Sequence, residues 1–474
     1  MQYETTIGLE VHIQLLTDSK IFCSCSTKFG SLPNENVCPI CMGMPGVLPV
    51  LNEKVVEFAV KLGLSLNCKI NKYSVMARKN YFYPDLPKNY QISQYELPIL
   101  QDGFVEIEDE DGFKEIPLER IHIEEDAGKT IHTSNSSLVD YNRTGVPLLE
   151  IVSKPAMNTP SQAYQYLRSL RRIVRYLGIC DGNMEEGSLR CDANVSIKPK
   201  GQIELGTKVE IKNMNSFKHV EKALEYEIER QIQAVENNQK IIQETRLFDE
   251  RTFTTKSMRT KEEAYEYRYF PDPDLLPIVI DNKFIEPIKN DLVELPFDKM
   301  KRFIKQYSLK EDDVKTLIES KELADYFEQV AKLSNPKSAI SWVLTETLGY
   351  LNKENKDITQ CKIKPVDLAD LINLVENNDI SGKIAKEVFS KMYESGSPPK
   401  TIIENENLTL IQDIGLLEKV LDEAIASNPK AVEQYKLGKK NTIGFFVGAV
   451  MKVTKGKADP KIINELIIKK LGEI

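Results

Sequence analysis

Acidic side chains, a histidine and several cations fall on the polar sides of three segments in which polar and apolar residues alternate. In chain order they are Glu10 and His12 in TTIGLEVHIQL, Arg190 and Asp192 in GSLRCDANVSI, and Lys208, Glu210 and Lys212 in TKVEIKNM. Carboxylates and imidazole bind divalent metal ions, and the cations beside them can neutralise phosphate. The pattern therefore predicts a surface for metal-assisted phosphoryl chemistry.

The elements that position these side chains should be β-strands. Successive side chains of a strand point to opposite faces, so each segment would pack its apolar side and display the other. A fourth segment, RIHIEEDAGKT, places Glu124 on a strand face and Glu125 where that strand ends. We expect the acidic residues to share one face of a sheet. For each residue the alternative is an ion pair with Arg190, Lys208 or Lys212 on a solvated face.

Several nucleotide and hydrolase motifs are absent from the sequence. Gly128-Lys129-Thr130 is not a Walker phosphate loop, because that motif needs a glycine at position 123, which is isoleucine. There is no serine nucleophile elbow, no amidase stretch rich in glycine and serine, and no Rossmann glycine fingerprint. Nucleophilic hydrolysis is thus disfavoured, and phosphates would be held by metal ions and basic side chains.

Four of the eight cysteines form two close pairs, Cys23–Cys25 and Cys38–Cys41. Two such pairs joined by a short loop suit a tetrahedral thiolate site, in which each pair holds one edge of the ion. The loop is rich in proline, glycine and asparagine, so a metal would supply most of its order. We predict a structural zinc site; reduced, unligated thiols are the alternative.

Composition and charge limit the class of protein. A chain of 474 residues with 41% hydrophobic and 28% charged residues is typical of a soluble protein of two to four domains. No apolar run approaches the roughly 20 residues that span a bilayer, and no basic, apolar leader is seen, so we expect a cytoplasmic protein without membrane contact. The net charge of −8 disfavours a general nucleic-acid binder.

The C-terminal segment has a different charge balance. Ten lysines and four acidic residues lie between Lys430 and Ile474. A basic tail on an acidic body fits contact with a polyanion at one end, and a solvated helical tail is the alternative.

The order of patterns predicts an α+β chain. Residues 1–292 read as short strands of antiparallel character, interrupted by a helix from Thr159 to Gly178 and a second from about Val220 to Thr245. Helical patterns follow, beginning with a capping box of Ser308 and Glu311. Prolines and a glycine near residue 398 break that run and mark a boundary before a small third unit.

A loop rich in charge and aromatic residues, ARKNYFYPDLPKNYQISQYE, contains Arg78, Lys79 and Lys88. Its composition is that of a site-forming loop rather than a linker. A related stretch, EYRYFPDPDLLP, occurs about 190 residues later.

Together these segments closely resemble one family, the B subunit of the bacterial glutamyl/aspartyl-tRNA amidotransferase. The matching stretches are IGLEVHIQL, YFYPDLPKNYQISQYE, IHIEEDAGK, DYNRTGVPLLEIV, GSLRCDANVSI, EIKNMNSF, YRYFPDPDL and FFVGAVMKVTKGKADPKIINELI. The likeness covers nearly the whole chain. The archaeal E-subunit relatives carry an inserted domain for which 474 residues leave no room, so the B subunit is favoured.

The resemblance implies a fold and a reaction. The fold is an antiparallel-sheet cradle domain (1–292) with an embedded four-cysteine loop, a helical domain (293–400) and a small all-α tail domain of the YqeY type (401–474). The reaction is ATP-dependent phosphorylation of the side-chain carboxylate of Glu-tRNA(Gln) or Asp-tRNA(Asn), followed by amidation. Ammonia would come from an amidase A subunit, with a C subunit as third partner.

On this basis we assign roles to the candidate residues. Catalysis falls to Glu10, His12, Glu125, Asp192 and Glu210, and Mg²⁺ binding to Glu10, His12, Glu124, Asp192 and Glu210, with His12 as ligand or general base. Structural zinc falls to Cys23, Cys25, Cys38 and Cys41. We expect five cations either to neutralise phosphate or to line the path of ammonia, namely Arg78, Lys79, Lys88, Arg190 and Lys208. Contact with tRNA falls to Lys436, Lys439, Lys440, Lys452, Lys455 and Lys457.

Two other functions remain open from sequence. One is a non-catalytic tRNA-binding scaffold, whose sheet face only docks a partner. The other is a stand-alone ATP-dependent carboxylate–amine ligase for a small metabolite, against which the basic tail and the missing nucleotide motif argue.

Overall fold

The computed structural model describes residues 3–110, 112–260, 267–406, 408, 414–436, 442–454, 458 and 460–473. The chain folds into two compact units, residues 1–296 and 297–474. Strands and helices form the first unit, whereas the described residues of the second are helical. This confirms the predicted α+β class. Among the described residues, no helix is both long and apolar enough to cross a membrane.

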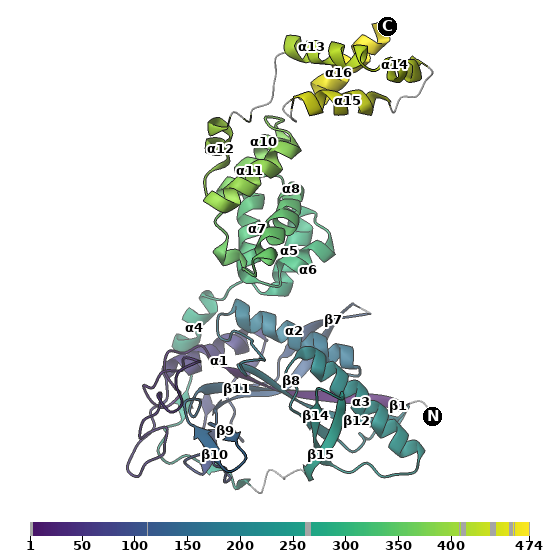
Figure 1. The fold of residues 1–474 in the computed structure, drawn as a ribbon. Helices are drawn as coiled ribbons and strands as arrows, with labels where there is room; N and C mark the ends of the chain where they lie inside the picture. The colour runs from purple at the N-terminus through teal and green to yellow at the C-terminus, as the bar shows by residue number, and fades with distance from the viewer. Residues whose placement is uncertain are drawn as a thin grey trace. The chain divides into compact units, whose positions relative to one another are not determined.

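A mainly antiparallel sheet forms the centre of the first unit (Figure 1). In spatial order its strands are β15 (Thr254–Thr260), β14 (Glu244–Asp249), β13 (Val209–Lys212), β12 (Leu189–Pro199), β1 (Tyr3–Gln14), β11 (Pro147–Ser153), β8 (Gly112–Glu125), β6 (Leu100–Gln101) and β2 (Lys69–Ile70), and β7 (Phe104–Asp109) pairs with β8. Neighbours are antiparallel except β13 and β14, which run parallel. The antiparallel character expected from sequence is confirmed with this exception.

Helices cover one face of the sheet, namely α1 (Glu53–Ser65), α2 (Pro160–Tyr176) and α3 (Phe217–Glu236) (Figure 1). Ile7 and Val11 of β1 are 0% exposed and share a core with Tyr166 of α2 and Leu224 of α3. β12 and β13 bury their apolar residues in the same way. The predicted alternation is confirmed, and it directs the polar side chains to the opposite face.

Two helix ends expected from the sequence can be compared with the structure, the start of α2 and the end of α3. Thr159 Oγ1 accepts a hydrogen bond from Gln162 N at 3.1 Å, as expected for the N-cap of α2. The expected span of α3 was wrong at its C-terminal end, because the helix ends at Glu236 and Thr245 already belongs to β14. Asn238 has a φ of 58°, a left-handed conformation that commonly ends a helix.

The first unit also contains several shorter strands outside the central sheet. They form three small sheets: β4 (Ala77–Asn80) between β5 (Tyr90–Ser93) and β16 (Phe270–Pro271), β3 (Tyr73–Ser74) with β17 (Ile278–Val279), and β9 (Lys129–His132) with β10 (Ser137–Asp140). The two similar aromatic stretches of the sequence therefore meet in space, because β16 pairs with β4. Helix α4 (Asn282–Asn290) follows them.

The second unit begins with helices packed around one apolar core. They are α5 (Pro296–Tyr307), α6 (Glu311–Leu317), α7 (Lys321–Leu333), α8 (Pro336–Ser341), the π-helix η2 (Trp342–Thr347), α9 (Leu348–Lys353), the 3₁₀ helix η3 (Ile358–Gln360), α10 (Pro365–Glu376), α11 (Gly382–Ser395) and α12 (Pro399–Asn405). The expected capping box is wrong: Lys310 is the N-cap of α6, and Ser308 has a left-handed φ of 51°.

A separate core joins α13 (Ile414–Ala426), α14 (Pro429–Lys436), α15 (Thr442–Val453) and α16 (Pro460–Glu473). Ile402, Ile403 and Leu408 pack in the preceding core, so α12 belongs with it although it begins at our expected break. The division into three domains stays a prediction, and the packing moves its second boundary beyond residue 408.

Candidate active site and cysteine cluster

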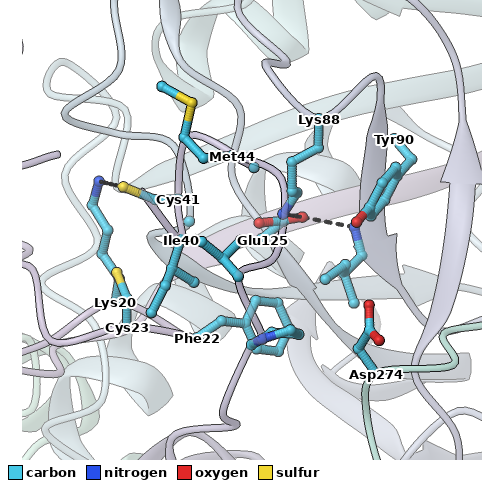
Figure 2. Close-up of a pocket in the computed structure, with 15 residues that line it drawn as sticks. Lys20, Phe22, Cys23, Ile40, Cys41, Met44, Lys88, Tyr90, Glu125 and Asp274 are labelled. Carbon is cyan, nitrogen blue, oxygen red and sulfur yellow. Dashed lines mark hydrogen bonds and ion pairs between the residues drawn. The ribbon is translucent and has the colours of Figure 1, made fainter. Parts of the chain in front are cut away.

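A small cavity of about 90 Å³ lies beside the cysteine loop, and Lys88, Tyr90 and Glu125 line it together with Cys23 and Cys41 (Figure 2). The Lys88 ammonium forms an ion pair with the Glu125 carboxylate, which also accepts a hydrogen bond from Ile92 N at 2.8 Å. Glu125 is 1% exposed. Contrary to expectation, it does not join the other carboxylates of the sheet.

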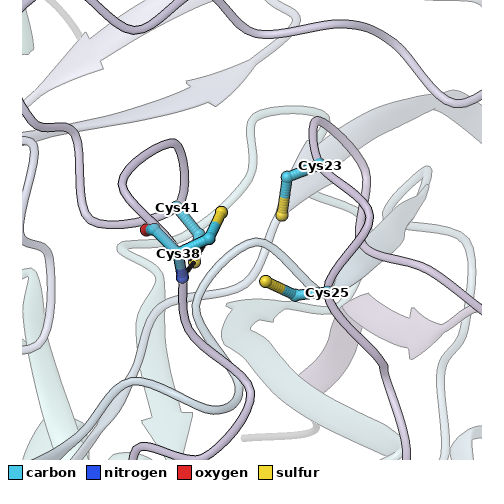
Figure 3. Close-up of side chains that lie close together, drawn as sticks. All are labelled: Cys23, Cys25, Cys38 and Cys41. Carbon is cyan, nitrogen blue, oxygen red and sulfur yellow. Dashed lines mark hydrogen bonds between the residues drawn. The ribbon is translucent and has the colours of Figure 1, made fainter.

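The four predicted cysteines come together at the edge of this cavity (Figure 3). Their sulfur atoms all lie within 4.8 Å of one another, and Cys38 N donates a hydrogen bond to Cys41 Sγ at 3.1 Å. A hydrogen bond from Cys23 lowers the pKa of the Cys41 thiol to about 4, with help from the Lys20 charge. Four converging sulfurs with a ready thiolate can bind a metal ion.

A buried lysine that the sequence reading missed supports this cluster. Lys20 is 0% exposed, and its Nζ lies 3.6 Å from Cys41 Sγ. The same ammonium donates to the carbonyl oxygens of Asn36 at 2.7 Å and Tyr141 at 3.3 Å. A buried charge needs compensation, and a site of four thiolates with one divalent ion would carry net negative charge. The fixed ammonium suits such a site better than four neutral thiols.

The largest group of predicted residues lines a cavity of about 420 Å³ on the polar face of the sheet. Its lining includes Glu10, His12, Glu124, Asp192, Glu210, Lys79 and Lys208 from our predictions, and His122, Glu150 and Lys212 in addition. Strands β1, β8, β11, β12 and β13 supply most of these side chains. The prediction that the acidic residues share one face is therefore confirmed for Glu10, Glu124, Asp192 and Glu210, but it is wrong for Glu125.

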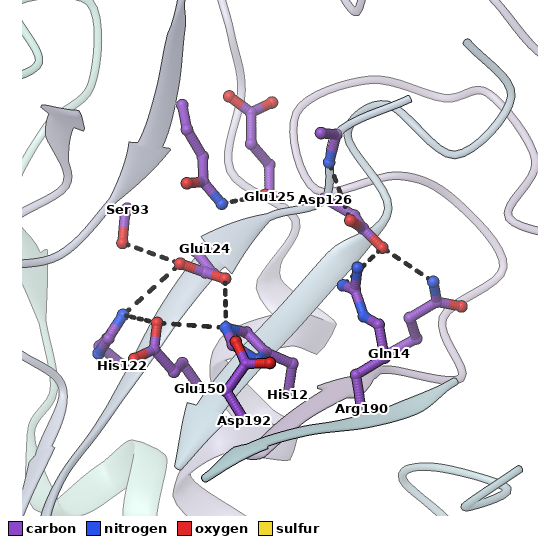
Figure 4. Close-up of polar contacts among 12 residues, drawn as sticks. His12, Gln14, Ser93, His122, Glu124, Glu125, Asp126, Glu150, Arg190 and Asp192 are labelled. Carbon is purple, nitrogen blue, oxygen red and sulfur yellow. Dashed lines mark hydrogen bonds and ion pairs between the residues drawn. The ribbon is translucent and has the colours of Figure 1, made fainter. Parts of the chain in front are cut away.

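Two histidines and two glutamates form one cluster within this cavity (Figure 4). His12 Nε2 lies 3.5 Å from Glu124 Oε1 and 3.4 Å from Glu150 Oε2. His122 Nε2 lies 3.1 Å from the same Glu150 oxygen and 3.6 Å from Glu124 Oε2. Strand register explains the cluster, because Glu150 of β11 lies opposite both His12 of β1 and His122 of β8.

Mutual attraction favours the charged forms of His122 and Glu150. Burial lowers the pKa of His122, but the charges of Glu150 and Glu124 outweigh it and raise the value to about 9. Burial raises the pKa of Glu150, yet the two histidines hold it well below its usual range. Ligand atoms of His12, Glu124 and Glu150 lie within 4.8 Å of one another. The donor set of one imidazole and two carboxylates fits a divalent cation.

The other acidic residues form a second group around a lysine. Asp192 forms an ion pair with Lys212, whose Nζ lies 3.6 Å from Glu210 Oε1. Glu10 lies opposite Asp192 in the sheet and accepts a hydrogen bond from Asn194 Nδ2 at 3.0 Å. Burial lowers the pKa of Lys212, but Asp192 and Glu210 raise it overall. Ion pairing, our alternative for single residues, thus applies here through Lys212.

The predicted cations divide among several places. Lys79 and Lys208 line the sheet-face cavity. Arg78 instead binds Asp272 at 2.8 Å and Asp274 at 2.9 Å, and its guanidinium lies over the Tyr90 ring.

Arg190 also lies outside the lining of the sheet-face cavity. Its Nη2 binds the buried Asp126 at 3.0 Å, and Gln14 Nε2 donates to the same carboxylate at 2.9 Å (Figure 4). Burial lowers the pKa of Arg190, but the Asp126 charge raises it overall. Arg190 therefore fixes the end of β12 rather than facing the cavity.

Of the tail lysines, Lys452 is exposed in the last turn of α15. Lys436 ends α14, but its side chain is not described. Lys439, Lys440, Lys455 and Lys457 lie outside the described residues.

The sequence reading missed Glu150 and did not assign His122 a role. A signal for Glu150 was present, because PLLEIVS places Glu150 between the apolar residues Leu149 and Ile151. A single glutamate in a short, otherwise apolar strand therefore also indicates a candidate site residue.

Comparison with known proteins identifies the family of this chain. Residues 5–286 match the family described as GatB/GatE catalytic domain, and residues 325–471 match the GatB domain family. Curated relatives named as B subunits of aspartyl/glutamyl-tRNA(Asn/Gln) amidotransferase include those of Thermodesulfovibrio yellowstonii, 57% identical, and Carboxydothermus hydrogenoformans, 55% identical, each with both chains fully covered. That of Persephonella marina is 50% identical over 98% of this chain and 99% of its own. By these full-length matches, the chain belongs to the family of aspartyl/glutamyl-tRNA amidotransferase B subunits.

Proposed function

We propose that this chain activates and amidates the side-chain carboxylate of Glu-tRNA(Gln) or Asp-tRNA(Asn). In the first step the carboxylate oxygen attacks the γ-phosphorus of ATP, giving an acyl phosphate and ADP. In the second, ammonia attacks the acyl carbon, phosphate leaves, and a proton is lost to a base. The single observation that carries this proposal is the sheet-face cavity in which carboxylates, histidines and lysines of a B-subunit family member converge.

Within that cavity the residues divide the work. His12, Glu124 and Glu150 would hold one Mg²⁺, and Glu10, Asp192 and Glu210 have the donors for a second. Bound Mg²⁺ supplies charge neutralisation for phosphoryl transfer, which is mostly positioning and electrostatics. Lys212 already sits between Asp192 and Glu210, so it is placed to neutralise a phosphate oxygen on the same surface.

The small cavity beside the cysteine loop would form part of the path along which ammonia arrives from the A subunit. Lys88 and Glu125 provide one polar pair there, and Lys79 lies 4.8 Å from the Tyr267 ring centre at the sheet-face cavity. Exposed apolar residues surround the cysteine loop and the neighbouring β4–β5 loop, namely Phe29, Leu32, Met44, Leu48, Val50, Phe82 and Tyr83. A surface of this kind fits a protein partner, which supports docking of the A subunit at this end.

The cysteine cluster would hold zinc in a structural role, because four thiolates leave no coordination position for substrate. Cys23 and Cys41 of the cluster line the same small cavity as Lys88 and therefore form part of its wall.

The tail would bind tRNA. Deletion should begin at residue 414 rather than 401, because Ile402, Ile403 and Leu408 pack in the preceding core. We expect the truncated complex to bind tRNA more weakly and with a flatter salt dependence. Each lost phosphate contact should reduce the slope of log K on log salt by about 0.7–0.9. Unchanged affinity and slope would exclude the tail from RNA contact.

The decisive experiment assays this chain co-expressed with A and C subunits for amide formation on Glu-tRNA(Gln). ATP, Mg²⁺ and ammonium chloride are supplied, because ammonium bypasses the glutaminase. Product that requires ATP and is lost in Glu10→Gln, with Glu115→Gln of β8 as the control outside the cavity, supports catalysis on this sheet. Product that survives Glu10→Gln, Asp192→Asn and Glu210→Gln together would leave this chain as a scaffold. Turnover without tRNA would favour the stand-alone ligase.

A further inference from the structure

A third cavity, of about 490 Å³, adjoins the sheet-face cavity and has a different lining. Val75, Ala77 and Leu97 form apolar walls, Phe270 adds an aromatic ring, and Arg268 adds a guanidinium. Tyr95 and Tyr269 line both cavities, so the two spaces share a wall.

That shared wall is an ordered aromatic stack. The rings of Tyr95 and Tyr269 lie 4.4 Å apart and within 6° of parallel. Phe270 is 45% exposed, and Tyr95 is 42% exposed. Exposed rings around an apolar hollow are unusual on a solvated surface and form a ready stacking platform.

The backbone beneath the platform is held firmly. Phe270 pairs with Arg78 in the small sheet of β4 and β16, and the Arg78 side chain binds Asp272 and Asp274. Arg78, which we had expected at a phosphate or on the ammonia path, thus holds the segment that carries Phe270 in place. A rigid apolar platform lowers the entropy cost of ordering a flexible ligand.

The proposed reaction brings two adenosines to this surface. One belongs to ATP, and the other is the 3′-terminal adenosine that carries the amino acid in every aminoacyl-tRNA. Single-stranded RNA ends are commonly held by stacking bases on aromatic side chains, with cations at the phosphates. The aromatic cavity offers both groups, whereas none of the acidic or lysine residues assigned to ATP phosphates lines it.

A fourth cavity, of about 420 Å³, is the better place for the nucleoside of ATP. It shares Glu10 and Lys208 with the sheet-face cavity, and its lining includes Ser153, Asn194 and Ser196. A nucleoside attached to phosphates at Glu10 and Lys208 would extend in that direction. The two adenosines would then approach the reaction centre from different sides.

We propose that the cavity lined by Tyr95, Phe270 and Arg268 binds the 3′-terminal adenosine of the aminoacyl-tRNA. The assignment rests on the proposed function, since it identifies the substrate end that accompanies the carboxylate. The purine stacks on an exposed ring, Arg268 meets the adjoining phosphate, and the esterified amino acid passes the tyrosine wall into the sheet-face cavity.

The test combines a protein change with an RNA change in the full complex. Equilibrium binding is measured for tRNA(Gln) with its terminal adenosine and for the same tRNA without it. Loss of one stacked base should cost the wild-type complex about tenfold in affinity. Phe270→Ala should weaken the intact tRNA by about the same factor and the shortened tRNA hardly at all. Phe113→Ala, a phenylalanine of similar exposure (47%) on β8, is the control.

Equal weakening of both tRNAs by Phe270→Ala would overturn the proposal.

A second pair of variants, Tyr95→Ala and Tyr95→Phe, controls for a folding defect. Phenylalanine keeps the stacking surface, so Tyr95→Phe should keep the affinity. In the ammonium-dependent assay, Phe270→Ala, which changes a residue of the aromatic cavity alone, should raise KM for Glu-tRNA(Gln) and leave KM for ATP unchanged. A rise in KM for ATP alone would assign the cavity to the nucleotide instead. Failure of the wild-type complex to form amide would refute the proposed function, while the binding comparison would still judge the adenosine site.

Discussion

Glu124 and Glu125 are neighbours in β8, yet their carboxylates serve two different cavities. Glu124 lies 3.5 Å from His12 in the sheet-face cavity, whereas Glu125 pairs with Lys88 beside the cysteines. Consecutive strand residues point to opposite faces, so the two adjacent residues contribute one carboxylate to each cavity. The sites proposed for activation and for ammonia supply are thereby fixed relative to each other.

This relationship predicts different defects for two isosteric changes. Glu124→Gln should abolish amide formation with either glutamine or ammonium chloride, because it removes a carboxylate from the proposed metal site. Glu125→Gln should reduce the glutamine-dependent rate more than the ammonium-dependent rate, because it disrupts the polar pair on the proposed ammonia path. The measurement is the ratio of the two rates, with Glu115→Gln as the control. An equal loss of both rates in Glu125→Gln would contradict the separation.

Glu150 should contribute to Mg²⁺ binding as much as His12 and Glu124, which the sequence analysis identified. Glu150→Gln keeps the shape of the side chain but removes the charge that faces both His12 and His122. We expect the Mg²⁺ concentration for half-maximal activity to rise by at least about tenfold, since even the loss of a residue that only orients a ligand typically costs about 10–100-fold in metal affinity. Titration with Mg²⁺ measures this directly. A normal Mg²⁺ dependence would remove Glu150 from the site.

The cysteine cluster should retain zinc through purification, and Lys20 should strengthen that binding. Cys38→Ser should remove the metal, as measured by elemental analysis, whereas Cys361→Ser, outside the cluster, should not. Lys20→Met preserves much of the apolar stem but deletes the ammonium beside Cys41. We expect faster zinc loss to a chelator in Lys20→Met because the thiolate charge is no longer compensated. An unchanged release rate would make Lys20 a packing residue only.

The cysteine loop should also position Lys88. Gly43 lies where a Cβ would collide with Cγ of Lys88 and approach its Cα to 3.3 Å. Gly46 provides a matched control, because it too has a positive φ (86° against 63° for Gly43) but no heavy atom within 4 Å.

Gly43→Ala should therefore lower the glutamine-dependent rate more than Gly46→Ala does, with the ammonium-dependent rate retained. Both variants place a Cβ at a positive φ, and only Gly43→Ala adds a contact with Lys88, so the comparison tests that contact. Indistinguishable variants would argue that the loop does not act on Lys88.

The helical unit offers a test of pH dependence. Arg302 binds Glu328 through two hydrogen bonds, of 2.8 and 3.0 Å, which hold the pKa of this carboxyl below its usual value. The pair then stabilises the fold above the unfolded pKa of about 4.3, and this contribution is lost as the pH falls through the folded value.

Glu328→Gln should lower the free energy of unfolding by about 1 kcal/mol at pH 7. Urea titrations at pH 7 and near pH 4 measure the difference, which should shrink at the lower pH. Glu404→Gln on α12 is the exposed control. A difference independent of pH would mean that packing, rather than charge, is lost.

The amino-acid order by itself determined which side chains of each strand are buried and which are displayed. Alternation around Glu10, His12, Asp192 and Glu210 was sufficient, because strand geometry assigns faces locally. The spacing of the cysteines likewise indicated their cluster, since a short loop forces the two pairs to meet.

Tertiary structure decided which displayed residues meet. His12, His122 and Glu150 adjoin only because β11 pairs with both β1 and β8 in one register. The pairing of β11 with β1, which lies more than a hundred residues earlier in the chain, leaves no local signal. The same holds for Arg78, whose side chain binds Asp272, about 190 residues later in the chain. Local pattern sets the direction of a side chain, but only the long-range pairing of strands sets its neighbours.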